Sequence, residues 1–233
     1  MKPVAIFTHT ECEPPGYLVD LLHAVNYPFQ LVCLHNDVNG DFELDDFSRL
    51  IFMGGPGNVA EPEPWMLQEM EIIRHARNRK IPQLGICLGA QLMSVAFGGR
   101  VWQADALEVG WHKVQLTATA KDCRWFDNLP QQFEVFQWHA HNFSLPPACT
   151  RVATSECTPC QGFIEGANLA IQFHLEMTVE IITTLIDKYA EDLTGQSDCI
   201  QNRQQILQDI DQHCQQTFDV ADHLLKQWLM LAD

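Results

Sequence analysis

The first half of the chain alternates between short apolar runs and longer amphipathic segments. Short runs rich in Val, Ile, Leu and Phe predict buried strands, whereas apolar residues recurring every three or four positions predict helices. The predicted strands are 3–9, 29–35, 49–53 and 81–86, and the predicted helices are 16–25, 64–80 and 88–97. Because strands and helices of this length follow one another, we predict a parallel sheet with helices on both faces.

The middle of the chain has a different pattern, with short predicted strands and few helices between them. These strands are 99–102, 110–116, 133–138, 150–154 and 161–164. They indicate a mixed or antiparallel extension of the sheet. A last apolar strand, 168–173, leads into a predicted helix at 178–189.

The C-terminal part is polar and rich in glutamine. Residues 195–198 predict a break, and residues 200–232 predict two helices that separate near Thr217 and Phe218. An acidic connector, 41–46, precedes the third strand. We therefore expect an α/β domain over 1–195, a three-layer open, mostly parallel sheet with helices on both faces. A helical extension over 196–233 is expected to pack on the same domain.

The composition fits a full hydrophobic core and argues against two classes of partner. The chain has 233 residues, 46% of them hydrophobic, and a formal net charge of −16. Nucleic acids and anionic membrane surfaces attract clustered positive charge, so we expect neither as a partner. No apolar run reaches the length of a membrane span, and no signal-like segment opens the chain. The nine scattered cysteines favour free thiols in a reducing cytoplasm.

One cysteine stands where a strand is predicted to turn sharply into a helix. The sequence Gly-Ile-Cys-Leu-Gly-Ala-Gln covers 85–91, with Cys87 as its third residue. Small residues at 85, 89 and 90 allow a tight turn, and the helix N-terminus favours a thiolate. Cys87 is therefore a candidate nucleophile. A lone cysteine after a strand is more often a small core residue, and its partners must decide between the two interpretations.

A base and its orienting group are available at the end of the last strand. His174 and Glu176 are two residues apart, so their side chains share one face as the chain leaves the sheet. The carboxyl edge of a parallel sheet is where catalytic residues collect. By itself a His-x-Glu sequence is more often ordinary surface, but beside Cys87 it forms a candidate Cys-His-Glu triad.

A glycine-rich loop follows the third predicted strand, with the sequence Gly-Gly-Pro-Gly at 54–57. Glycines let backbone N–H groups approach a bound ligand, although an ordinary turn has the same composition. The loop lacks the Lys-Ser/Thr pair of a phosphate loop. Backbone N–H groups of Gly55 and Leu88 are candidate donors to the oxyanion of a tetrahedral intermediate.

These motifs, in this order, resemble the class I glutamine amidotransferases, and most closely the stand-alone proteins similar to the amidotransferase half of GMP synthase. The resemblance covers about 45–190 and includes Gly-Trp-His at 110–112 and Val-Phe-Gln-Trp-His at 135–139. It implies a flavodoxin-like amidotransferase fold. It also implies that Cys87 attacks the side-chain amide of glutamine, that His174 transfers protons, and that Glu176 orients His174.

The resemblance further implies where the substrate binds. Gly57 and Gln91 match positions that hold glutamine, and His139, Ala140 and His141 match the stretch that binds its amino-acid end. Related proteins often have His-Gly-Asp in that stretch, so this chain differs there in backbone freedom and in charge. They also often have Pro where this chain has Leu between His174 and Glu176, a change that keeps both functional groups.

Three functions remain open at this stage. The chain is expected to hydrolyse glutamine or a γ-glutamyl compound and release ammonia, and a separate synthetase subunit is a possible ammonia acceptor. Alternatively, it is a stand-alone γ-glutamyl peptidase or hydrolase, or a non-catalytic regulatory protein that retains the fold. The intact Cys87, His174 and Glu176 speak against the last alternative. A homo-oligomer is also an open possibility.

A second cysteine motif lies at 157–160, where Cys157 and Cys160 suggest a zinc or redox site. One such pair supplies two of four zinc ligands, and His139 and His141 are candidates to complete the set. A loop with ordinary thiols is the favoured interpretation, so we expect neither a metal nor a cofactor. His112 lies in a predicted strand and is expected to be structural.

Overall fold

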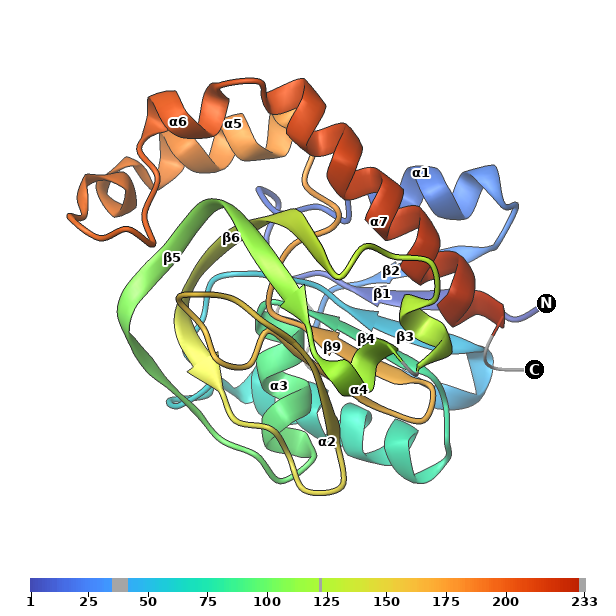
Figure 1. The fold of residues 1–233 in the computed structure, drawn as a ribbon. Helices are drawn as coiled ribbons and strands as arrows, with labels where there is room; N and C mark the ends of the chain where they lie inside the picture. Colours follow the sequence, from blue (N-terminus) through green and yellow to red (C-terminus); the bar gives the residue numbers. More distant parts are fainter. Residues whose placement is uncertain (35–41, 122, 231–233) are drawn as a thin grey trace.

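A nine-stranded sheet forms the centre of the molecule. The computed structural model describes residues 1–34, 42–121 and 123–230, and in these the strand order is β2-β1-β3-β4-β9-β8-β7-β5-β6 (Figure 1). The strands are β1 (Val4–Phe7), β2 (Phe29–Val32), β3 (Arg49–Phe52), β4 (Gln83–Ile86), β5 (Val101–Leu116), β6 (Gln132–Phe143), β7 (Thr150–Thr154), β8 (Gly162–Glu165) and β9 (Asn168–Ile171). Neighbours from β2 to β9 are parallel, and those from β9 to β6 are antiparallel. The α/β class with an antiparallel extension is therefore confirmed.

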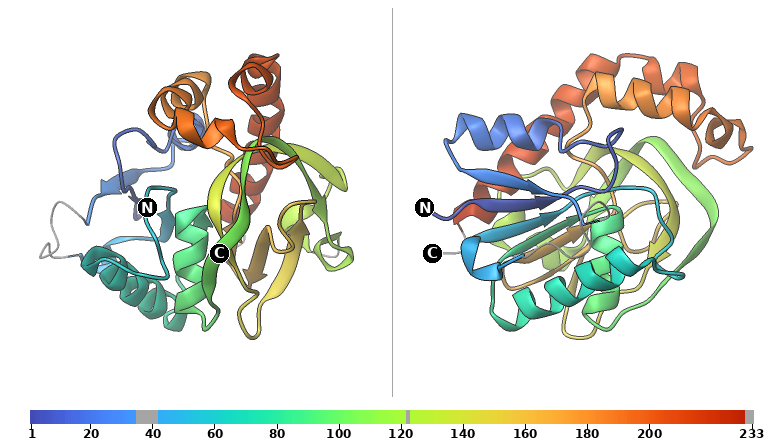
Figure 2. Two further views of the ribbon diagram at one scale, coloured as in Figure 1. Left: turned by 90° about the vertical axis from the view of Figure 1, so that its left-hand side faces the viewer. Right: turned by 180° about the vertical axis from the view of Figure 1, so that it is seen from behind.

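Helices cover both faces of the parallel half. The α-helices are α1 (Tyr17–Ala24), α2 (Pro64–Asn78), α3 (Leu88–Ala96), α4 (Ala118–Lys121), α5 (Val179–Lys188), α6 (Arg203–Leu207) and α7 (Ile210–Met230). Three short 3₁₀ helices are η1 (Leu44–Asp46), η2 (Arg124–Phe126) and η3 (Ala190–Thr194). Figure 2 shows α2 and α3 on one side of the sheet and α1, α5 and α7 on the other.

Alternate residues of the parallel strands build the two hydrophobic cores. In β1, Val4 and Ile6 belong to the core with α1 and α7, whereas Ala5 and Phe7 belong to the core with α2 and α3. Every residue of β1, β3, β4 and β9 is buried. This double burial explains why the strands appear in the sequence as continuous apolar runs rather than as an alternating pattern.

The antiparallel half differs from the prediction in the length of its strands. The two strands predicted at 99–102 and 110–116 are parts of one strand, β5, which pairs with β6 along its length. The register shifts between Gln103 and Glu108, where polar residues interrupt the apolar pattern. Strand β6 continues beyond residue 138 to Phe143, so His139 and His141 lie in a strand.

The C-terminal helices separate at a different place from the predicted one. Helix α7 runs unbroken through Thr217 and Phe218, and the break lies at Asp209, whose φ is 52°. Thr217 is buried, and Phe218 stacks on Tyr17 with ring centroids 3.9 Å apart. Tertiary packing therefore stabilises helix α7 where the local sequence suggests an end.

Several predicted bounds extend beyond the residues that the structure describes. Residues 35 and 41, the ends of the predicted second strand and of the acidic connector, lie outside them, as do residues 231–233 of the predicted tail. The short elements α4 and η2 were not predicted. Among the described helices, none combines the length and the apolar character required to cross a membrane.

Candidate active site

Cys87 lies at the turn between β4 and α3. Its φ of 49° is in the left-handed region, which a non-glycine residue adopts only where the surrounding structure requires it. Its backbone N–H donates to the carbonyl of Ile171 over 2.9 Å, which ties the turn to β9. Position 89 requires glycine, since a Cβ on Gly89 would lie 2.1 Å from the carbonyl oxygen of Phe52. The thiol is therefore held in one place at the carboxyl edge of the parallel strands.

His174 and Glu176 follow β9 and form a buried pair. The distance from His174 Nδ1 to Glu176 Oε1 is 2.6 Å, and each residue is 1% exposed. The backbone N–H of His174 donates to the carbonyl of Phe136 over 2.9 Å, and that of Leu175 donates to Glu176 Oε2, also over 2.9 Å. The spacing of two residues thus brings both side chains to one place.

The imidazole of His174 is hydrogen-bonded to Glu176 through Nδ1. Burial by itself would lower the pKa of His174, but the charges of Glu176 and Cys87 and the hydrogen bond to Glu176 raise it well above its ordinary value. A protonated imidazole next to a thiolate is the form in which a cysteine nucleophile is activated.

Two further groups contact the sulfur of Cys87. Gln172 Nε2 donates to Sγ over 3.6 Å, and the carbonyl oxygen of Trp138 lies 3.8 Å from Sγ. Gln172 is fully buried, and the sequence reasoning missed it. Its spacing of two residues from His174 was the available signal, since alternate residues share one face of a strand.

The glycine-rich loop lies against the same residues. A Cβ on Gly54 would lie 3.0 Å from His174 Cε1 and 3.6 Å from Cys87 Cβ. His9 supports the loop, because its Nδ1 lies 3.0 Å from the carbonyl oxygen of Gly54. A buried carboxylate, Glu69, holds Nε2 of His9 at 3.0 Å. Burial by itself would lower the pKa of His9, but Glu69 raises it above the ordinary value.

The two candidate oxyanion donors flank the sulfur. Leu88 is the first residue of α3, directly after Cys87, and Gly55 lines the cavity that Cys87 also lines. In the described part of the chain, neither backbone N–H donates a hydrogen bond to a protein group. Both are therefore available to a bound oxygen atom, as an oxyanion hole requires.

A cavity of about 150 Å³ opens at Cys87. Its lining combines the catalytic candidates with acidic and aromatic side chains: Glu13, Gly55, Pro56, Cys87, Trp138, His174, Leu185, Tyr189 and Asp192. Glu13 was not predicted, because it lies in the loop after β1 and no spacing rule marks it. Burial raises the pKa of Glu13 above its ordinary value. Asp192 Oδ2 accepts a hydrogen bond from Trp138 Nε1 over 2.9 Å.

The predicted substrate-binding residues lie beside this cavity rather than in its lining. Gln91 Nε2 donates to the carbonyl of His141 over 3.4 Å and to Gln172 Oε1 over 3.3 Å, so it belongs to the hydrogen-bond network of Cys87. Gly57 packs on Met66, whose Cε would lie 2.2 Å from a Cβ at that position. Burial lowers the pKa of His141.

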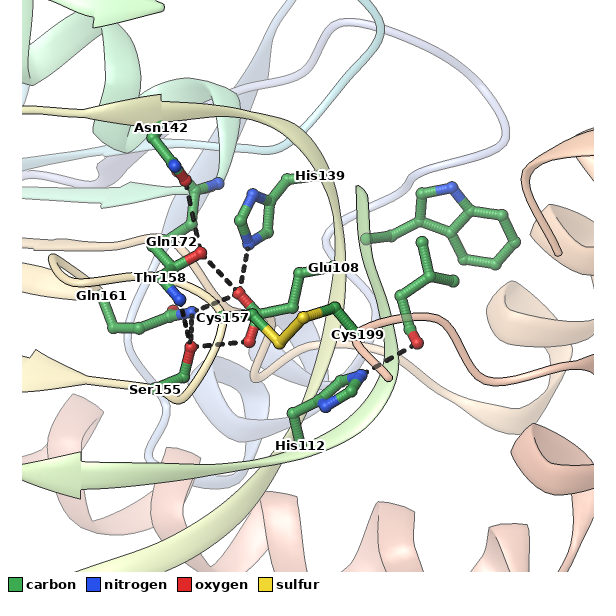
Figure 3. A network of polar contacts seen from close by, with 12 residues as sticks. Glu108, His112, His139, Asn142, Ser155, Cys157, Thr158, Gln161, Gln172 and Cys199 are labelled. Atoms are coloured by element: carbon green, nitrogen blue, oxygen red, sulfur yellow. Dashed lines mark hydrogen bonds and ion pairs between the residues drawn. A yellow bond between two sulfur atoms is a disulfide. The ribbon is translucent and has the colours of Figure 1, made fainter. Parts of the chain in front are cut away.

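His139 pairs with Glu108, which faces it across the β5–β6 ladder. Figure 3 shows the polar cluster around this buried carboxylate. Glu108 accepts hydrogen bonds from His139 Nε2 at 3.1 Å, Ser155 Oγ at 2.7 Å, Thr158 Oγ1 at 2.7 Å and Gln161 Nε2 at 2.9 Å. Burial would raise the pKa of Glu108, but His139 and the hydroxyl donors hold it below the ordinary value.

A disulfide corrects the prediction that the cysteines are free thiols. Cys157 is bonded to Cys199, which lies 42 residues away in the C-terminal part. Cys160 is buried elsewhere, and burial raises its pKa to about 11. His139 bonds to Glu108 and to the carbonyl of His141 rather than completing a site with these cysteines. Sequence spacing could not reveal a partner so far along the chain.

The polar cluster and Cys87 are joined by a continuous series of contacts. His139 Nδ1 lies 3.1 Å from the carbonyl oxygen of His141, which accepts from Gln91. Gln91 in turn bonds to Gln172, and Gln172 bonds to Cys87. The predicted substrate-binding stretch therefore lies between two buried carboxylate–histidine pairs.

Comparison with known proteins gives consistent matches. Residues 17–188 match the family described as glutamine amidotransferase class-I. A glutamine amidotransferase-like protein of Salmonella typhimurium is 30% identical over 156 residues, which are 64% of this chain and 65% of that relative. A GMP synthase subunit of Thermoplasma acidophilum, described as glutamine-hydrolyzing, is 32% identical over 148 residues, 61% of this chain and 69% of that relative.

A solved structure matches almost the whole chain. The crystal structure of a glutamine amidotransferase from Methylobacillus flagellatus superposes with a TM-score of 0.92 at 28% sequence identity. The superposition covers 99% of this chain and 95% of that one. It therefore includes the antiparallel half and the C-terminal helices as well as the parallel sheet.

Proposed function

The chain belongs to the class I glutamine amidotransferase family, and we propose that it hydrolyses the side-chain amide of glutamine through a thioester on Cys87. The observation that carries this proposal is the buried Cys87–His174–Glu176 series at the strand-to-helix turn. The family by itself suggests an enzyme, whereas the reaction and the residue roles are our inference from the geometry.

In the first half of the proposed reaction, the thiolate of Cys87 attacks the amide carbon of glutamine. The C–N bond then breaks, His174 gives its proton to the departing nitrogen, and ammonia leaves. Glu176 keeps the imidazole in the required orientation and stabilises its protonated form. In the second half, His174 takes a proton from water, which attacks the thioester, releases glutamate and restores the thiolate.

The tetrahedral intermediates carry a negative oxygen that needs donors. We assign the backbone N–H groups of Gly55 and Leu88 to this role, because both flank Cys87 and neither donates to another protein group among the described residues. Each such donor typically lowers the barrier by about 3 kcal/mol.

The substrate is proposed to lie between the glycine-rich loop and the β6 stretch. Gln91 contributes through its bonds to His141 and Gln172, and Gly57 leaves backbone exposed beside Met66. His139, Ala140 and His141 would border the amino-acid end of the substrate. Because related proteins often have His-Gly-Asp there, we expect this stretch to set the substrate preference of this chain.

The fate of the ammonia is a separate proposal. One of the relatives is named as a subunit of GMP synthase, and this supports a partner that is a separate, ammonia-accepting subunit. Stand-alone hydrolysis of a γ-glutamyl compound is the alternative. The two proposals differ in one expectation: a partner subunit raises the rate of ammonia release in the first and has no effect on it in the second.

The test is to treat the full chain with a glutamine-like diazoketone and to locate the adduct by mass spectrometry. We expect one adduct, on Cys87, and ammonia release from glutamine or from γ-glutamyl peptides. Cys160→Ala is the matched control, because it removes a buried thiol outside the site.

Cys87→Ala should abolish both the adduct and the ammonia release while the far-ultraviolet circular dichroism is retained. Activity that survives Cys87→Ala would show that the nucleophile is misassigned. A chain that forms no adduct and releases no ammonia from either substrate class would be a non-catalytic member of the family.

A further inference from the structure

Glu108, His112 and Cys157 gather at a cavity that is separate from the one at Cys87. One potential ligand atom from each lies within 4.8 Å of the other two. Glu108 and His112 belong to β5, Cys157 follows β7, and Cys199 joins them through the disulfide (Figure 3). An adjoining cavity of about 530 Å³ is lined by these four residues among others.

We propose that reduction of the Cys157–Cys199 disulfide turns this cluster into a zinc site with Glu108, His112, Cys157 and Cys199 as ligands. Two thiolates, one imidazole and one carboxylate are a donor set that Zn²⁺ binds in tetrahedral geometry. The site goes beyond the proposed amide hydrolysis and does not depend on it, because none of the four residues lines the cavity at Cys87.

The reduction step requires a dithiol as reductant. The dithiol supplies two electrons and two protons, the S–S bond breaks, Cys157 and Cys199 become thiols, and the dithiol becomes a disulfide. Zinc then binds the two thiolates, and the two thiol protons pass to solvent. A reducing cytoplasm, as predicted from the sequence, would supply such dithiols.

Glu108 is prepared to act as a ligand. Hydrogen bonds from Thr158, Gln161 and His139 converge on its Oε2, whereas Oε1 accepts only from Ser155 among the described residues. Oε1 therefore keeps a lone pair for a metal, and the donors on Oε2 hold the carboxylate in place. Such outer contacts are what orient metal ligands in proteins.

His112 presents one ring nitrogen in the form that a metal needs. Its Nε2 lies 3.0 Å from the carbonyl oxygen of Val109. A carbonyl can only accept, so Nε2 carries the hydrogen and Nδ1 of the neutral ring has a free lone pair. A histidine ligand whose other nitrogen donates to a backbone carbonyl is the usual arrangement around protein-bound zinc.

The cavity offers a route for a cation. Glu156 and Asp198 line it beside the proposed ligands, and Lys113 is the opposing positive charge in its lining. Ligand atoms around zinc are roughly 3.3 to 3.8 Å apart. Glu108, His112 and Cys157 must therefore close by up to about 1 Å, whereas the two sulfurs, bonded to each other in the disulfide, must separate. Breaking the disulfide frees the segment around Cys199 for this movement.

The test measures zinc affinity in the full chain with Cys87→Ala, so that the catalytic thiol cannot bind metal. After anaerobic removal of the reductant, we expect the reduced protein to bind one Zn²⁺ per chain. Substitution with Co²⁺ should give a thiolate-to-metal charge-transfer band. The oxidised protein should bind Zn²⁺ at least about 100-fold more weakly, since it lacks both thiolates.

Cys157→Ser and His112→Gln should each weaken zinc binding by more than the roughly 10- to 100-fold of an outer-shell change. Cys160→Ser, three residues from Cys157, is the matched control and should bind zinc as the parent does. Because the two substitutions lie on different elements, a folding defect in one variant leaves the other as a test.

Equal zinc affinity in the reduced and oxidised proteins would overturn the proposal. So would zinc binding that survives both Cys157→Ser and His112→Gln, or zinc binding that is lost with Cys160→Ser. The experiment measures metal binding in a chain without the Cys87 thiol. A failure to bind zinc therefore leaves the proposed amide hydrolysis untouched, and a failure to hydrolyse the amide leaves the proposed zinc site untouched.

Discussion

Two of the buried carboxylate–histidine pairs in the described part of the molecule, Glu176–His174 and Glu108–His139, differ in what surrounds them. Glu176 holds His174 at 2.6 Å, and the only other donor to its carboxylate among the described residues is the backbone N–H of Leu175. Glu108 holds His139 at 3.1 Å and accepts from three further side chains. The first pair adjoins the thiol of Cys87, whereas the carboxylate of the second is held by hydroxyl and amide donors.

The surroundings of the two pairs act on the pKa values of His174 and Glu108. In the first pair, Glu176 and Cys87 outweigh burial and raise the pKa of His174 well above its ordinary value. In the second, His139 and the hydroxyl donors outweigh burial and lower the pKa of Glu108. A histidine that faces a thiol can move protons, whereas a carboxylate held by four donors contributes rigidity.

The largest expected effect comes from Glu176→Gln. We expect kcat/KM for amide hydrolysis to fall about 10³- to 10⁴-fold, because the amide neither orients nor stabilises the protonated imidazole of His174. The alkaline limb of the pH–rate profile should also move toward lower pH, since Glu176 is a main cause of the raised pKa. Steady-state kinetics between pH 5 and about 10 measure both changes. A profile unchanged by the substitution would contradict the assigned role.

The second prediction removes the other carboxylate. Glu108→Ala should lower the free energy of unfolding by about 3 to 5 kcal/mol, because His139 and three further donors lose a buried acceptor. Urea unfolding measures this change in the free energy of unfolding. The matched control is Glu156→Ala, an exposed carboxylate near the cluster, which should change stability by less than about 0.5 kcal/mol. Equal effects of the two substitutions would show that the network around Glu108 is not stabilising.

The third prediction concerns the same carboxylate at low pH. Because the folded state lowers the pKa of Glu108 below 4.5, its contribution to stability is complete above pH 4.5 and is lost as the pH falls through the lower folded value. Glu108→Gln should therefore flatten the acid side of the stability–pH curve. Thermal unfolding measured at pH values above and below 4.5 tests this prediction. A stability–pH curve of Glu108→Gln parallel to that of the parent protein would contradict it.

The smallest expected effect is that of Ser155→Ala. It removes the hydrogen bond to Glu108 Oε1 and the two bonds that Ser155 Oγ accepts, from the backbone N–H of Thr158 and from Gln161 Nε2. The three donors on Oε2 stay in place. We expect a loss of about 2 to 3 kcal/mol in unfolding free energy, because one hydrogen bond to a charged group is lost and two further donors lose their acceptor. Ser197→Ala, which removes a hydroxyl that accepts from the backbone N–H of Cys199, provides a hydroxyl control outside the carboxylate network. A Ser155→Ala loss as large as that of Glu108→Ala would mean that the network acts only as a whole.

Local sequence was sufficient to predict the parts of the fold and site that depend on short spacing. The apolar runs marked β1, β3, β4 and β9, because both faces of the parallel half are buried. The turn at Cys87 and the two-residue spacing of His174 and Glu176 likewise involve neighbouring residues only. The break in the C-terminal helices was misplaced, because packing of Phe218 on Tyr17 joins residues far apart in sequence.

The amino-acid sequence by itself therefore determined the alternation of strands and helices, the turn at Cys87 and the histidine–glutamate pair beside it. Only the tertiary structure decided that Glu108 meets His139 across 31 residues, that His9 meets Glu69 across 60, and that Cys157 meets Cys199 across 42. Spacing rules act within one helix or strand end. Partners brought together by sheet register and by the return of the C-terminal helices have no such local signature, because their proximity is set by the packing of the whole chain.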